Sequence, residues 1–475
     1  MTHVAATARV PPGPKGHWLL GNLPERRSDP LTLFQRGRER YGDVVRYPMG
    51  PLLMYQLSHP DDVKRVLVDN AQNYQKTALM QRLRPVLGEG LLLSEGDFWK
   101  RQRRLAQPAF HRERMEDIAA LITRLVEESL PRWDALAARG EPFDLCAELM
   151  RLVLSITGQV LFSTDLSGAA NDMARAVTTV LEELNQRVLS ALPLPSLLPL
   201  PGHLRLRSAI RVLDRIVYGI IDGRHRGTDA SGDLLSMLMA ARDADTGEGM
   251  SDRQLRDEVM TLVLAGHETT ANALAWTFLL LHQHPEAAKR LVEEVTGVLD
   301  ERTPTFQDLP RLRYTARVFD ESMRLYPPAW LISRVALADD ELGGYMLPRG
   351  SIVVMLPYVI HRHPAFWERP DSFDPDRFLP ERAGTRPRFA WLPFGGGQRM
   401  CIGSGLALLE GQLCLAMLAR RYRFQLVPEH PVVPQALVTL RPRFGLRVIA
   451  RRREPGTVQG EVLDGAGRER SDARP

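Results

Sequence analysis

Most of the chain repeats apolar residues at the 3.6-residue spacing of an amphipathic α-helix. This pattern predicts helices over residues 30–41, 61–70, 98–107, 112–138, 144–162, 251–282, 285–299, 315–325 and 406–421. Strand-like runs are fewer and shorter, at 43–47, 52–57, 331–336 and 352–356, with a hairpin over 437–450. The pattern therefore predicts a mainly α fold with small β-sheets.

The longest predicted helix begins after Ser251, a good N-cap, and about 30 helical residues would span about 45 Å. Its interior holds Gly266, Glu268 and Thr269, which are unusual in the middle of a helix. One interpretation is a packing kink. The other is a groove opened by Gly266 beside a bound group, where Glu268 and Thr269 handle protons. A zinc protease is excluded, because Ala271 stands where the second histidine is needed.

Three segments lack a regular period. Residues 74–97 read as an irregular loop with apolar pieces, which suggests a binding loop, and residues 363–393 are rich in proline. The leucine- and proline-rich segment 189–201 is either a linker or a lid over an apolar pocket. No repeat or linker divides the chain. We expect a disordered N-terminus at 1–10, a single catalytic domain at 11–450 and a disordered tail at 451–475.

Composition narrows the class of protein. The chain has 475 residues, of which 44% are hydrophobic and 25% are charged, and this is typical of a globular protein with a large core. The net charge of +5 comes without a nucleic-acid-binding motif, so we expect no nucleic-acid partner. No apolar run reaches the ~18 residues of a membrane span, which predicts a soluble protein without a membrane anchor.

The three cysteines have different settings. They are far apart in sequence and form no CxxC pair, so a disulfide framework or a structural zinc site is not expected and a cytoplasmic location fits. Cys146 and Cys414 lie in apolar helical runs and read as core residues. Cys401 lies in the loop from Phe394 to Gly403, directly before a helix. A thiolate there, favoured by close backbone N–H groups and the helix N-terminus, suits iron, including haem iron.

Other charged residues have two readings each. Glu321 and Arg324, three apart on a helix, form either a solvated surface pair or, with Arg377, a buried network. Trp99 and Arg103 lie four apart on one helix face. Together with Arg399 and Arg334 they are either donors to a ligand carboxylate or ordinary packed and surface residues.

Taken together, these residues resemble the cytochrome P450 family. The resemblance spans residues 11–448, with its motifs in the family's order. The motifs are Trp99-x-x-x-Arg103, Ala265-Gly266-x-Glu268-Thr269-Thr270, Glu321-x-x-Arg324, Pro375-Asp376-Arg377-Phe378 and the Phe394–Gly403 loop. Asp376 departs from the glutamate frequent in the family, whereas Arg377 is kept.

The resemblance implies a cytochrome P450 fold, with haem b between the long central helix and the helix after the cysteine loop. Cys401 would be the iron ligand, and Phe394 would tune its sulfur. Glu268 and Thr269 would deliver protons on the opposite face. Implied propionate donors are Trp99, Arg103, Arg334 and Arg399, and the implied structural brace of the cysteine loop is Glu321, Arg324 and Arg377.

The implied activity is that of a monooxygenase, which inserts one atom of O₂ into a C–H (or C=C) bond. An apolar substrate such as a terpenoid, a fatty acid or a polyketide-like molecule is expected. Apolar residues near the motifs suggest a pocket made of Leu83, Leu92, Leu264, Ala265, Trp330, Leu331 and Leu440. Two rival readings are a peroxide-dependent haem-thiolate enzyme and a non-catalytic haem sensor. The Glu268–Thr269 pair argues against both, because peroxide-dependent members often lack such an acid–alcohol pair and a sensor needs no proton delivery.

Electrons would come from a separate ferredoxin, flavodoxin or flavin reductase, and ultimately from NAD(P)H, and we expect the chain to be a monomer. Arg399 replaces a histidine common in soluble bacterial members, so the loop resembles the microsomal and flavin-reductase-linked branches. A basic face for the electron donor is suggested by Lys100, Arg101, Arg104, Arg112 and Arg388. The alternative is scattered surface charge.

Overall fold

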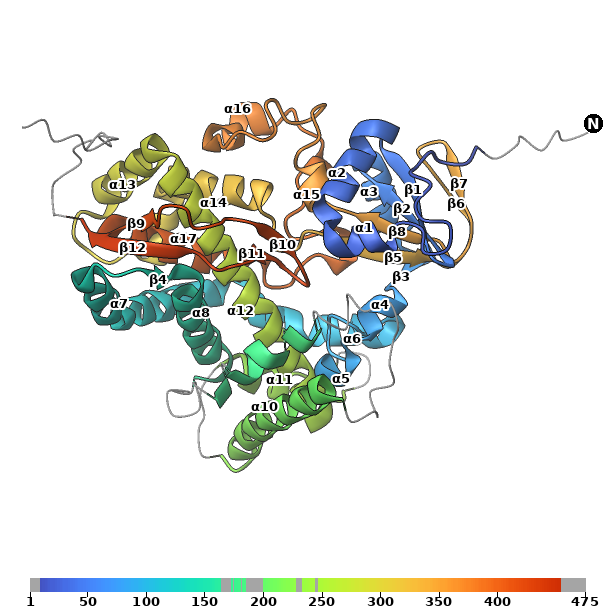
Figure 1. Cartoon of the computed structure of the whole chain (residues 1–475). Helices are drawn as coiled ribbons and strands as arrows, with labels where there is room; N and C mark the ends of the chain where they lie inside the picture. Colours follow the sequence, from blue (N-terminus) through green and yellow to red (C-terminus); the bar gives the residue numbers. More distant parts are fainter. Residues whose placement is uncertain are drawn as a thin grey trace, which may run out of the picture.

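The computed structural model describes residues 9–163, 172–173, 175–180, 182–184, 200–227, 233–243 and 247–453. Most long helices gather around one central helix, and a smaller region carries the largest sheet (Figure 1). The architecture is mainly α with several small sheets, as the pattern predicted.

All the long helices except α10 lie close to predicted positions; no helix was predicted over residues 201–225. Among the described residues the long helices are α2 (Pro30–Tyr41), α6 (Gly96–Ala106), α7 (Met115–Arg139), α8 (Leu145–Phe162), α10 (Pro201–His225), α12 (Asp252–Gln283), α13 (Pro285–Leu299), α14 (Arg313–Leu325) and α17 (Ser404–Arg421). The shorter helices are α1 (Leu23–Ser28), α3 (Pro60–Lys64), α4 (Ala78–Gln81), α5 (Arg84–Leu87), α11 (Leu234–Ala240), α15 (Pro357–Ile360) and α16 (Pro380–Ala383). The helix predicted at 61–70 is α3 followed by a π-helical turn, Arg65–Asp69.

The central helix is α12, and it starts where the sequence predicted. Ser251 Oγ accepts a hydrogen bond from Gln254 N, and the Gln254 side chain accepts one from Ser251 N at 2.7 Å. This reciprocal cap satisfies two N–H groups that the first turn would otherwise leave unpaired. Beyond the cap α12 packs against α8, α10, α14 and α17. A helix covered on most sides needs no polar stripe, which explains its long apolar pattern.

The largest sheet has the order β1-β2-β8-β5-β3. Its strands are β1 (Val44–Met49), β2 (Leu52–Leu57), β3 (Tyr74–Gln75), β5 (Ile332–Ala336) and β8 (Ile352–Met355). The predicted hairpin of β1 and β2 is confirmed, with Val44 opposite Leu57. Strand β8 joins β2 in parallel, so this sheet ties the first part of the chain to residues about three hundred positions later.

The C-terminal hairpin predicted at 437–450 is wrong. Strands β10 (Pro434–Ala436) and β11 (Leu440–Pro442) pair with each other, whereas β12 (Arg447–Arg452) pairs with β9 (Tyr422–Leu426) and β4 (Phe143–Asp144). Strand β12 also extends past residue 450, and Arg453 donates to Ala419 O at 3.0 Å, so the predicted tail does not begin at 451. The rest of that tail, residues 454–475, lies outside the described residues, as do residues 1–8.

The irregular regions contain more structure than predicted. Residues 74–97 include β3, α4 and α5, which are too short to show a hydrophobic period. Strands β6 (Asp340–Leu342) and β7 (Tyr345–Leu347) form a further small hairpin that the sequence analysis missed. The linker or lid proposed at 189–201 falls outside the described residues up to position 199, and α10 begins at Pro201.

One described helix, α8, is long and apolar enough to cross a membrane by length and composition alone. The sequence analysis found no such run, because Glu148 and Arg151 interrupt the apolar residues of this helix. In the fold, 61% of α8 is buried, and it packs against α7 and α12. Core helices of water-soluble proteins pass the same test, so α8 is weak support for a membrane span.

Helix packing predicts opposite effects for two glycines. A Cβ at Gly411 of α17 would lie 2.2 Å from the Phe319 ring of α14. Gly411→Ala should therefore lower the free energy of unfolding by about 1–3 kcal/mol, measured by urea denaturation. A Cβ at the exposed Gly297 of α13 would meet no atom within 4 Å, so Gly297→Ala should stabilise the protein by ~0.5–1 kcal/mol. Equal stability of the two variants would contradict the close α14–α17 contact.

Candidate functional site

The cysteine loop is closed by its own backbone. Cys401 N donates to Phe394 O at 3.0 Å, and α17 begins at Ser404, shortly after the cysteine. The loop needs glycine at position 397, where φ is +66° and an added Cβ would lie 1.9 Å from Leu67 O. Phe394 packs against the main hydrophobic core. The loop therefore presents one thiol in a fixed position at the N-terminal end of α17.

The Cys401 thiol is surrounded by neighbouring atoms, yet the residue keeps accessible surface. Burial raises the pKa of the thiol, while a hydrogen bond from the Gly403 backbone N–H and the charge of Arg103 act in the opposite direction. The predicted support from the helix N-terminus is therefore present, but burial outweighs it. A reachable sulfur with two partners that favour its anion suits a metal ligand, and the metal's own charge would complete the stabilisation.

A cluster of cations lies beside this loop. Arg399 stacks over the Trp99 ring at 3.8 Å, pairs with the Glu95 carboxylate and donates to Ser94 O at 2.8 Å. Arg103 donates to Met400 O at 2.9 Å, which ties α6 to the cysteine loop. These contacts confirm that the predicted residues Trp99, Arg103 and Arg399 come together.

Arg334 and one unpredicted residue, Lys76, join the same cluster. Burial, with the charges of Arg399 and Arg334, lowers the pKa of Lys76 to about 7. Burial also lowers the pKa of Arg399 to about 10, with Arg334 and Arg103 adding to the effect and Glu95 opposing it. Neither Lys76 nor Glu95 was predicted, because both lie within residues 74–97, which were interpreted as an irregular loop.

This charge distribution tests whether the site suits a dianionic cofactor. Arg399, Arg334 and Lys76 each interact with the carboxylate of Glu95, and Arg103 lies beside Arg399 and Cys401, so the arginine charges alone exceed this one carboxylate. Two carboxylates of a ligand would relieve that excess, and arginine forks match carboxylate geometry. Together with the Cys401 thiol, the donors present fit the propionates and the iron of a haem.

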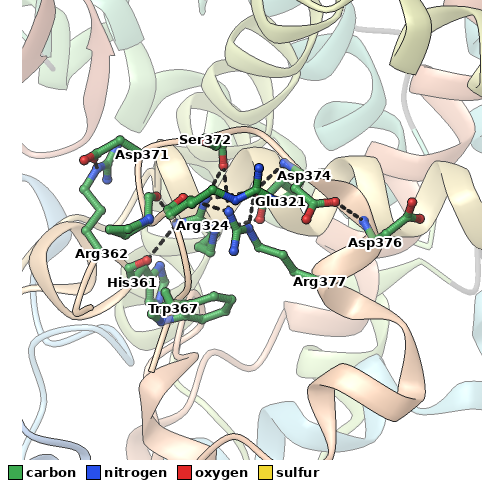
Figure 2. Close-up of polar contacts among 12 residues, drawn as sticks. Glu321, Arg324, His361, Arg362, Trp367, Asp371, Ser372, Asp374, Asp376 and Arg377 are labelled. Carbon is green, nitrogen blue, oxygen red and sulfur yellow. Dashed lines mark hydrogen bonds and ion pairs between the residues drawn. The ribbon is translucent and has the colours of Figure 1, made fainter. Parts of the chain in front are cut away.

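The buried network interpretation of Glu321 is confirmed (Figure 2). Glu321 accepts from Arg324 at 2.7 and 2.8 Å, from Arg377 at 3.3 Å and from Asp374 N at 2.8 Å. Glu321 and Arg324 have no exposed surface, and Arg377 is 2% exposed. The remaining guanidinium N–H groups of Arg324 and Arg377 donate to backbone carbonyls between His361 and Ser372.

The network connects to the cysteine loop through His361. Arg324 donates to His361 O at 2.8 Å, and the His361 ring accepts from Leu392 N at 3.0 Å. Leu392 O then accepts from Gly395 N at 3.1 Å, at the start of the loop. Burial holds the pKa of His361 well below its usual range, so the ring stays neutral and can accept that bond. The contacts thus form a continuous path from the network to the cysteine loop.

On α12 the predicted pair Glu268 and Thr269 separates onto two faces. Ala265 and Thr269 keep accessible surface on an otherwise buried helix, and Thr269 Oγ1 donates to Ala265 O at 2.6 Å. Glu268 is 1% exposed and hydrogen-bonds with Thr439 in the turn between β10 and β11. A Cβ at Gly266 would lie 3.7 Å from Thr157 of α8, an ordinary van der Waals contact, and Gly266 itself is half-buried.

A second acidic residue in contact with α12, Glu410, was not predicted. Glu410 of α17 is 4% exposed, and burial raises the pKa of its carboxyl group to about 8, with a hydrogen bond from Thr270 opposing the rise. Its Oε1 has no hydrogen-bond partner among the described residues. The Thr270–Glu410 contact places Thr269 at the level where α12 meets the helix that follows Cys401. A carboxylate inside the apolar pattern of 406–421 was the available signal.

The predicted pocket residues differ in exposure. Leu440 is fully buried and Leu83 is 3% exposed, so both pack in hydrophobic clusters. Leu264 and Trp330 are each 8% exposed, and Trp330 Nε1 donates to Leu437 O at 2.8 Å. Surface remains on Leu92, Ala265 and Leu331.

The predicted basic face is less positive than the sequence suggested. Arg101 and Arg104 both reach Asp243, at 4.0 and 2.7 Å, and Lys100 pairs with Asp97 at 2.8 Å. Arg388 lies 5.8 Å from the Phe389 ring, and the side chain of Arg112 is not among those described. A hollow of about 460 Å³ remains on this face, lined by Trp99, Lys100, Arg103, Arg104, Gln107, Pro108, His111 and Gln398.

Comparison with known proteins agrees with this geometry. The family model for cytochrome P450 matches residues 11–446. The chain therefore belongs to the cytochrome P450 family. Members use haem b as cofactor, and this chain is a P450 monooxygenase.

Its relatives include bacterial oxygenases of similar length. Cyclooctatin synthase of Streptomyces melanosporofaciens is 41% identical over 403 residues, which cover 84% of this chain and 87% of the relative. Cyclooctat-9-en-7-ol 5-monooxygenase of the same organism is 37% identical over 411 residues, which cover 86% of this chain and 88% of the relative. Pentalenene oxygenase of Streptomyces avermitilis is 34% identical over 456 residues, which cover 96% of this chain and 99% of the relative.

Removing the charge of Glu321 should destabilise the segment that supports the cysteine loop. Glu321→Gln leaves two buried guanidinium groups without a counter-charge, which should cost about 3–5 kcal/mol of unfolding free energy and lower the haem content. Urea denaturation and the ratio of Soret to protein absorbance measure the two effects. Glu381→Gln, at an exposed position of α16, is the matched control and should change stability by less than ~0.5 kcal/mol. Equal behaviour of the two variants would refute the bracing role.

Proposed function

We propose that this chain inserts one atom of O₂ into a C–H (or C=C) bond of a terpenoid, with Cys401 as the iron ligand of haem b. The observation that carries the proposal is the accessible surface in the middle of α12. Ala265 and Thr269 are accessible there, at the level where Thr270 contacts Glu410 of α17, the helix that follows Cys401. A thiol on one side and a hydroxyl on the other suit the two faces of a haem. The substrate class rests on the relatives, whose names include cyclooctat-9-en-7-ol and pentalenene.

Each residue then has a chemical task. Lys76, Trp99, Arg103, Arg334 and Arg399 would bind the propionates, and Phe394 would limit access of water to the sulfur. Bound haem supplies the activation of O₂. Thr269 would hold and pass a proton at Oγ1, with Glu268 as its source. Leu92, Ala265 and Leu331 would orient an apolar substrate and exclude water, because each of these apolar residues keeps accessible surface.

Electrons would reach the protein from a separate ferredoxin, flavodoxin or flavin reductase at the hollow beside Lys100 and Arg103. An acidic side chain of the donor fits a hollow whose charged lining residues are Lys100, Arg103 and Arg104, although Arg104 is shared with Asp243. A location in a reducing cytoplasm is consistent with three free cysteines. We propose one catalytic domain, which the match over residues 11–446 supports.

Removing the Thr269 hydroxyl tests the proposed chemistry. Thr269→Ala should divert electrons from product to peroxide or water, because the proton carrier is gone, and product per NAD(P)H should fall about 10-fold or more. Thr269→Ser keeps the hydroxyl and should stay near wild type. The red-shifted Soret band of the reduced, CO-bound protein should be unchanged in both variants, which checks thiolate ligation. Undiminished product per NAD(P)H in Thr269→Ala would contradict proton delivery and would favour a peroxide-dependent enzyme.

Charge reversal at the hollow tests the docking proposal. Lys100→Glu should slow the first electron transfer from an acidic ferredoxin by roughly 3- to 10-fold at low salt, and the deficit should shrink as salt screens the charges. Stopped-flow spectroscopy under CO measures this step. Lys289→Glu, an exposed change on α13, is the control for net charge and should have little effect. A rate for Lys100→Glu equal to this control would refute docking at the hollow.

A further inference from the structure

The turn between β10 and β11 is fastened to α12 by side chains. Asn272 Nδ2 donates to Thr439 Oγ1 at 3.1 Å, and Trp276 Nε1 donates to Leu440 O at 3.1 Å. Trp330 Nε1 adds a bond to Leu437 O from the opposite side of the turn. The turn therefore cannot move without breaking bonds to the same helix that carries Glu268 and Thr269.

Glu268, Asn272 and Thr439 form a buried polar set, with exposed fractions of 1%, 1% and 5%. An ionised carboxylate only accepts hydrogen bonds, and a hydroxyl has a single proton to give. The Thr439 proton therefore goes to Glu268, and Asn272 must present its N–H to the Thr439 oxygen. The Asn272 bond has this direction, and the Thr439 contact lowers the pKa of Glu268, as a donor to its carboxylate would.

We infer that Thr439 and Asn272 are positioning residues, which hold the Glu268 carboxylate toward the β10–β11 turn and away from the Thr269 face of α12. This inference deepens the proposed function and rests on it. Displacement of the turn, for example by a substrate that presses against it, would remove the Thr439 bond and release Glu268. Proton supply at Thr269 would then depend on the position of the β10–β11 turn.

The charges around Glu268 support this assignment. Burial raises the pKa of its carboxyl group, whereas the Thr439 hydroxyl and the charge of Arg441 on β11 lower it. On α12 itself the neighbouring His267 stays neutral, because burial lowers its pKa to about 4. On α17 the acid of Glu410 faces Thr270 and has a raised pKa. Loss of the Thr439 bond leaves burial less opposed, so Glu268 would take up a proton that it can pass on.

The test replaces Thr439 by valine, which has the same shape and no hydroxyl. The protonation of Glu268 is followed by infrared spectroscopy of the haem-loaded protein, from the carboxyl stretch that a matching Glu268→Gln protein lacks. Thr439→Val should raise the apparent pKa of Glu268 by about one unit, a tenfold shift in its protonation equilibrium. Thr439→Ser should restore the wild-type titration. In Thr439→Val, the pH dependence of product per NAD(P)H should move to higher pH by the same amount.

Asn272→Ala keeps the test decisive if Thr439→Val does not fold. It leaves the hydroxyl in place without its fixed orientation, so the titration should shift in the same direction by a smaller amount. An unchanged Glu268 titration in a folded variant would overturn the inference, even if Thr269→Ala still uncouples the reaction. Failure of Thr269→Ala to uncouple would instead count against the proposed function, whatever the titration of Glu268 shows.

Discussion

The shape of the segment that leads into the cysteine loop depends on one constraint, the buried carboxylate of Glu321. It balances two guanidinium groups in a fully buried site, and these groups satisfy the carbonyls of a long segment without regular secondary structure. A chain of this kind has few backbone hydrogen bonds of its own, so its shape must come from side chains. The geometry of the cysteine loop therefore derives from an ion network located in another part of the sequence.

The central helix α12 combines three roles on different faces: it packs in the core, exposes Thr269 and buries Glu268. One side packs against four helices and is apolar, another leaves Thr269 accessible, and a third holds Glu268 against the β10–β11 turn. Successive helical residues point about 100° apart, so a neighbouring acid and alcohol cannot share one face. The separation of Glu268 from Thr269 is thus a property of the helix, and communication between them needs a change in side-chain orientation.

Most of the long helices and the first hairpin were predictable because their apolar periods are long and their caps are clear, as with Ser251 and α12. The residues of the cysteine loop, the cation cluster and the Glu321 network were also found from motifs. Lys76 and Glu95 were missed, because their role depends on a tertiary approach of α6, β5 and the cysteine loop. The pairing of β12 with β9 and β4 was missed for the same reason, since strand partners far apart in sequence leave no local period.

The pairing of Glu95 with Arg399 has a consequence for assembly of the holoprotein. This carboxylate neutralises part of the cation cluster, so these buried charges have a partner within the chain itself. If the proposed propionate contacts form at Arg399, one carboxylate partner would be exchanged for another. Such an exchange involves little net change in charge pairing at Arg399, which makes late insertion into a largely folded chain physically reasonable. Glu95 acts in this sense as a placeholder for the group that replaces it.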